Sequence, residues 1–84
     1  MTDFMELLYH YARTNRFPGC LPPRAYKEVT QIEERTLSAL REGLSAPHAA
    51  ALERYQDASE ERRTLELEAM FLAAFSVARE LCRA

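Results

Sequence analysis

The chain has 84 residues, of which 48% are hydrophobic and 29% charged, the composition of a small folded protein and not of a disordered segment. Its formal net charge of −2 gives no electrostatic attraction to nucleic acid or to an anionic membrane, so neither is expected as a partner. Thirteen alanines, eleven leucines and eleven glutamates favour helices, whereas two glycines leave little material for hairpin turns. We therefore expect an all-α fold in one domain, residues 1–84.

The first predicted helix covers about residues 2–14. Thr2 is a suitable N-cap, and Asn15 can adopt the left-handed conformation that ends a helix. The apolar side chains of this helix recur at helical spacing and form one stripe, made of Phe4, Leu7, Leu8 and Tyr11. The following residues, 15–22, hold two of the four prolines and one of the two glycines, and a third proline, Pro23, comes directly after them, which predicts a rigid connector.

Two further helices are predicted at about 23–43 and 46–82, joined by a tight corner. Gly43 suits a Schellman ending of the second helix, with Leu44 as its hydrophobic contact, and Ser45 can cap the third helix at once. We expect these two helices to pair as an antiparallel hairpin. The expected inner face of the second helix comprises Tyr26, Val29, Ile32, Glu33, Thr36, Leu37, Leu40 and Leu44.

The long third helix changes character along its length. Up to Thr64 it carries one thin apolar stripe, whereas from Leu65 onward apolar residues occupy two opposite sides. One side comprises Leu65, Ala69, Leu72, Phe75 and Cys82. The other, which we call the association stripe, comprises Leu67, Met70, Phe71, Ala74, Ala78 and Leu81. The short first helix can cover only one of these two sides. We expect a second copy of the chain to cover the other side, which gives a homodimeric helical bundle.

Neither a metal site nor a catalytic site is predicted. The zinc-binding residue types His10, Cys20, His48 and Cys82 lack the short spacing that structural zinc sites use. Near Cys20 no glycine-built turn could bind an oxyanion, and the expected fold offers no pocket, so we expect no enzyme activity and no cofactor, with both thiols free. The chain has no run of about 20 apolar residues and no signal-peptide pattern at its start, which favours a cytoplasmic location.

The middle of the expected hairpin is polar, and two interpretations are open. Both helices rise equally per residue, so residues at equal distances from the corner lie opposite each other. This places Glu33 opposite Tyr55 and Gln56, and Thr30 opposite Ser59. These contacts fix the register of the hairpin, with Glu33 reaching Arg62, or they form a surface on which a partner helix docks. The first interpretation is the preferred one.

Short motifs along most of the chain resemble those of one protein family. They are Glu6-Leu7-Leu8-Tyr9, Tyr26, the segment Leu52-Glu53-Arg54-Tyr55-Gln56-Asp57-Ala58, and Glu66 followed by Phe71, Phe75 and Arg79. They look like small helical proteins of Firmicutes and of their phages and other mobile elements, a family without an assigned activity. The resemblance implies a small helical fold and a mobile-element context, and it supplies no catalytic residues.

The sequence favours a cytoplasmic helical protein–protein interaction module that self-associates through its third helix. The alternative is a phage-type or mobile-element inhibitor that binds a host enzyme or a defence nuclease as its protein partner. Its acidic partner surface would comprise Glu60, Glu61 and Glu66. A helix-turn-helix regulator of DNA ranks below both, because a straight helix of about 37 residues is not a recognition helix.

Overall fold

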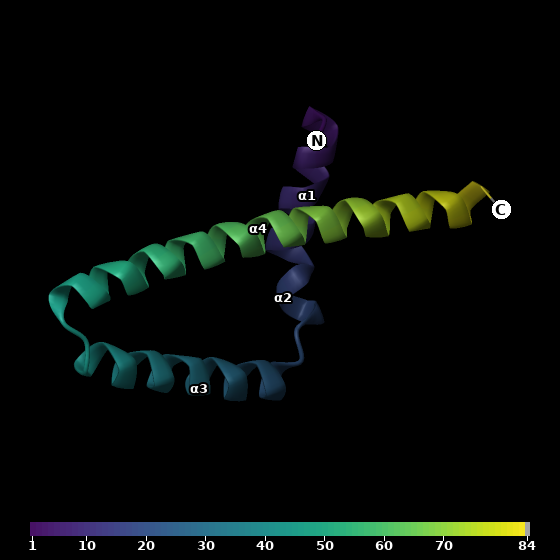
Figure 1. Ribbon diagram of the computed structural model, residues 1–84. Helices are drawn as coiled ribbons and strands as arrows, with labels where there is room; N and C mark the ends of the chain where they lie inside the picture. Colours follow the sequence, from purple (N-terminus) through teal and green to yellow (C-terminus); the bar gives the residue numbers. More distant parts are fainter. Residues whose placement is uncertain (84) are drawn as a thin grey trace. The chain divides into compact units, whose positions relative to one another are not determined.

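The computed structural model describes residues 1–83 and forms only α-helices in that range (Figure 1). Their order is α1 (Asp3–Asn15), α2 (Phe17–Cys20), α3 (Pro23–Glu42) and α4 (Ala46–Arg83). The all-α class that the composition predicts is therefore confirmed. None of these helices, within residues 1–83, combines the length and the apolar character needed to cross a membrane.

The chain divides into two units. The first, Met1–Ala49, contains α1, α2, α3 and the first residues of α4, and the second begins at Ala50 and consists of the remainder of α4. Each unit is described by itself below. The single domain, the hairpin and the bundle expected from sequence concern how these units pack, and they stay predictions.

The helix α1 begins at the predicted cap and ends in an unpredicted way. The Met5 N–H donates to Thr2 Oγ1 over 3.2 Å, so Thr2 is confirmed as the N-cap. At the other end, the side-chain amide of Asn15 donates to the Tyr11 carbonyl over 3.2 Å. No non-glycine residue in the described range has a positive φ, so the left-handed ending at Asn15 is wrong. The Asn15 amide satisfies a terminal carbonyl within right-handed geometry instead.

The predicted connector, residues 15–22, contains a short helix that the sequence analysis did not predict. Pro18 lies in the first turn of α2, where a missing N–H costs nothing. The Gly19 N–H donates to the Arg16 carbonyl over 3.1 Å, and the Leu21 N–H to the Pro18 carbonyl over 3.4 Å. These tight turns, together with packing of α2 on α1, make the proline-rich segment helical where a plain connector was expected.

The turn after α3 also differs from the prediction. Gly43 has φ −93° and ψ −1°, which is right-handed backbone, so the Schellman ending is wrong. The Gly43 N–H donates to the Leu40 carbonyl over 3.2 Å, and the Leu44 N–H donates to the Arg41 carbonyl over 3.3 Å. Each bond spans three residues, so the last turn tightens to a 3₁₀ geometry and satisfies the terminal carbonyls without a left-handed glycine.

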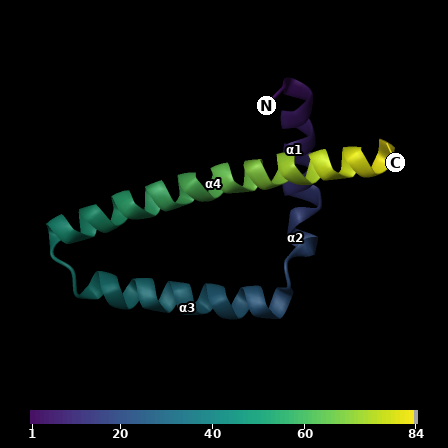
Figure 2. The same cartoon turned by 45° about the vertical axis from the view of Figure 1, so that its right-hand side comes forward.

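The helix α4 runs without a break for 38 residues, as both views show (Figures 1 and 2). After Pro47 it contains neither proline nor glycine, so no residue interrupts the backbone hydrogen bonds. Its rise of about 1.5 Å per residue gives a length of about 57 Å. Two local contacts support the polar segment, Thr64 Oγ1 donating to the Glu60 carbonyl over 3.1 Å and Arg62 pairing with Glu66 over 2.9 Å.

Burial on α1 falls on a different stripe from the one expected. Tyr9 is buried, with 5% of its surface exposed, and the half-buried residues beside it are Met5, Leu8 and Ala12. This stripe is shifted by one position from the predicted one, of which Phe4, Leu7 and Tyr11 are exposed. The two stripes overlap at Leu8, and periodicity alone cannot distinguish them because both have helical spacing.

Most of the expected inner face of α3 is exposed as well. Of its members only Leu37 and Leu44 are half-buried, while the large apolar side chains of Tyr26, Val29, Ile32 and Leu40 are exposed. An amphipathic pattern shows which residues are suited to burial, and a covering partner is needed before they are buried. The expected cover of this face is α4, so its burial depends on the hairpin and stays a prediction with it.

Candidate interaction surface

All six residues of the association stripe lie on α4 within the second unit. A rotation of about 100° per residue places them within roughly 100° of one another around the helix. Leu67 and Phe71 are half-buried, and the other four are exposed. Met70 and Leu81 present the most surface, with exposed fractions of 68% and 72%. The stripe is therefore an apolar strip in which the Met70 and Leu81 side chains are open to solvent.

Val77 belongs beside this stripe and was missed in the sequence analysis. It lies seven residues after Met70, close to it around the helix, and 56% of its surface is exposed. The signal that could have found it is a seven-residue repeat. Leu67, Ala74 and Leu81 are spaced by seven, and Met70 and Val77 each follow by three, as in the apolar positions of a coiled coil.

The opposite side of this part of α4 is also apolar. Leu65 and Leu72 are exposed there, and Phe75 is half-buried. Phe75 stacks on Phe71, one turn earlier, with ring centroids 6.4 Å apart and planes inclined by 30°. This aromatic pair lies between the two sides and contributes a local stacking contact one helical turn apart.

The three carboxylates of the alternative partner surface do not share a side of α4. Glu60 and Glu61 are neighbours in sequence, so they point about 100° apart. Arg62 donates to the Glu66 carboxylate over 2.9 Å, and both side chains are more than 60% exposed. Arg62 was assigned to Glu33 by the register hypothesis, and it pairs here within its own helix. The inhibitor hypothesis stays a prediction, without one acidic face to support it.

The residues considered for metal binding and nucleophilic chemistry are dispersed. Cys20, at the end of α2, and Cys82, near the end of α4, are free and exposed. His10 lies on α1 against the ring of Tyr9, with centroids 5.6 Å apart, and His48 lies in the first turn of α4. Throughout residues 1–83, no three His, Cys, Asp or Glu side chains gather closely enough to hold a metal ion.

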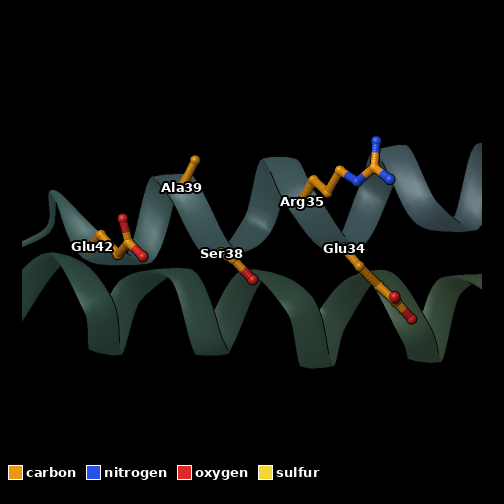
Figure 3. Close-up of a pocket in the computed structure, with 5 residues that line it drawn as sticks. All are labelled: Glu34, Arg35, Ser38, Ala39 and Glu42. Carbon is orange, nitrogen blue, oxygen red and sulfur yellow. The ribbon is translucent and has the colours of Figure 1, made fainter.

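One shallow hollow lies along α3, lined by Glu34, Arg35, Ser38, Ala39 and Glu42 (Figure 3). All five lining residues are exposed, and Figure 3 shows Glu34 and Ser38 pointing to one side of the helix while Arg35 and Ala39 point to the other. Side chains that diverge in this way do not surround a ligand. The hollow therefore offers no converging polar groups of the kind that binding and catalytic sites use.

The comparisons with known proteins add no relative: no family model, curated protein or solved structure matches the chain. The resemblance to helical proteins of mobile elements stays a prediction. The functional interpretation is therefore based on the surfaces of the described residues, and in particular on the association stripe of α4.

Proposed function

We propose that this chain is a helical protein–protein interaction module that self-associates through the association stripe of α4. The observation that carries the proposal is the exposure of Met70, at 68%, and of Leu81, at 72%, within one apolar strip. Large contiguous apolar surface is costly in water and is typical of interaction sites. A second copy is the natural cover, because two-fold pairing brings the same surface of both chains together.

The size of the strip is consistent with a dimer of modest affinity. Together with Val77, the association stripe offers on the order of 500 Å² per protomer, so two copies would bury on the order of 1,000 Å². This area is close to the lower limit for a specific protein–protein interface. We therefore expect a dimer that dissociates on dilution, and not an obligate one.

The test compares one substitution inside the stripe with the same substitution outside it. Met70→Asp places a carboxylate in the buried interface and should raise the dissociation constant about a hundredfold or more, equivalent to about 3 kcal/mol. Leu65→Asp is the matched control, because Leu65 is 61% exposed and lies on the opposite side of the same helix. Sedimentation equilibrium measures association, and circular dichroism checks that both variants remain helical.

Three results are informative. Loss of the dimer in Met70→Asp but not in Leu65→Asp supports the proposal. If both variants weaken the dimer equally, the contact is not confined to one side of α4, which contradicts the assigned stripe. A native chain that is monomeric at every concentration contradicts self-association altogether.

A further inference from the structure

The apolar surface of α4 follows a coiled-coil repeat that stops within the helix. Leu67, Ala74 and Leu81 occupy one position of the repeat, and Met70 and Val77 occupy the other apolar position. The same two positions one repeat earlier hold Glu60 and Arg63. Because α4 is continuous from Ala46 to Arg83, its apolar and charged segments share one face, and this restricts how a second copy can pair.

We infer that two copies of α4 pair in antiparallel orientation, with Met70 of one copy opposite Leu81 of the other and Ala74 opposite Val77. This inference rests on the proposed self-association and adds its orientation and register. In antiparallel coiled coils, each residue at the first apolar position faces one at the second position of the other helix. The assigned pairs obey this rule, and each combines two apolar side chains.

Charge is the reason to prefer this arrangement over parallel pairing. A parallel pair in register would place Arg63 against Arg63 of the second copy, and Glu60 against Glu60, at positions that face the partner. Like charges brought together at an interface repel, and removing them from water adds to the cost. Antiparallel pairing separates the two polar segments, so neither charge meets its own copy.

Charge also selects the register. Sliding one helix by a full repeat, with Met70 opposite Ala74, would place Leu81 of one copy against Arg63 of the other. The same shift would bring Glu66 next to Glu80 of the second copy, and both side chains are exposed in the free chain. In the proposed register, Glu80 faces Ala73 instead, and Glu66 keeps its ion pair with Arg62. The proposed register is therefore the one in which apolar residues face apolar residues and like charges stay apart.

Disulfide formation between engineered cysteines tests the orientation. The background carries Cys20→Ser and Cys82→Ser, because both native thiols are exposed and would react. Met70→Cys and Leu81→Cys are made separately in this background, and each is oxidised alone and after mixing. Antiparallel pairing should give a covalent dimer on a non-reducing gel only in the mixture, whereas Leu65→Cys, on the opposite side of α4, should give none with either variant.

The outcomes separate the orientation from the proposed function. A covalent dimer formed by Met70→Cys alone would show parallel pairing and overturn the inference, while leaving self-association intact. Noncovalent dimers without any cross-link, seen by light scattering before oxidation, would likewise overturn the assigned register. A native chain that stays monomeric at every concentration would contradict the proposed function itself, and the inference with it.

Discussion

The two halves of α4 in the second unit have the same backbone and opposite surfaces. Residues 50–64 are mostly polar and include the wholly polar run 59–64, whereas residues 65–83 carry exposed aliphatic side chains on more than one side. Both halves are helical, so helix formation does not depend on which surface is present. The difference shows that helix propensity fixes the backbone, while the pattern of side chains decides where another molecule can pack.

Local contacts also differ between the halves. The Thr64 hydroxyl supports the polar half, and the ion pair between Arg62 and Glu66 supports its end, where the apolar half begins. The apolar half has the stack of Phe71 on Phe75. Ion pairs on an exposed helix surface contribute little to stability, and they leave no apolar area to bury. The apolar half is therefore the part of α4 whose association should change stability.

The largest effect is expected from breaking the helix in one half at a time. Proline in a helix interior costs about 3 kcal/mol, so Ala73→Pro and Glu61→Pro should lower the helical signal by similar amounts. Only Ala73→Pro disrupts the association stripe, so only this variant should lose the dimer in light scattering. Equal loss of the dimer in both variants would contradict the assignment of different roles to the two halves.

A smaller effect is expected from the aromatic pair. Phe71→Ala removes a half-buried ring from the association stripe and should weaken the dimer by about 1–2 kcal/mol, part of the cost of emptying a fully buried site. Phe75→Ala removes the same stack from a residue outside the stripe, so it should weaken association less. Dissociation constants from sedimentation equilibrium measure both, and a larger effect of Phe75→Ala would place the interface on the other side of α4.

The smallest effect is expected from the ion pair that joins the polar half to the start of the apolar half. Glu66→Gln removes the ion pair with Arg62, and because both side chains are more than 60% exposed the helix should lose only about 0.3–0.5 kcal/mol. Thermal unfolding followed by circular dichroism measures the loss, and the dissociation constant should not change. High salt should reproduce the loss in the native chain and add little in the variant, because salt screens exposed charges. A dimer that depends strongly on this pair would contradict the purely local role assigned to it.

Features set by neighbouring residues were predictable from the sequence. The all-helical class follows from alanine, leucine and glutamate with few breakers, and the cap at Thr2 follows from its hydroxyl at the start of a helical pattern. The continuity of α4 follows in the same way, because no proline or glycine occurs after Pro47. Each of these features depends on side chains within one helical turn.

Features that depend on distant contacts or weak local preferences were not predictable. The four residues of α2 are too few to show a helical period, and Pro18 and Gly19 indicated a turn. Gly43 permits a left-handed ending without requiring one, and the chain closes α3 with 3₁₀ bonds. On α1, two overlapping stripes had the same spacing, so burial of Tyr9 could not be distinguished from burial of Phe4. For the candidate surface, the six stripe residues stay a prediction, and Val77 was left out of it because two opposed stripes were considered and not a seven-residue repeat.

Light scattering behind a sizing column, over a wide range of loading concentrations, tests self-association most directly. The native chain should have a mass near twice 9.7 kDa at high concentration and fall towards 9.7 kDa on dilution, as expected for an interface of modest area. A mass that stays at 9.7 kDa at every concentration would contradict self-association through α4.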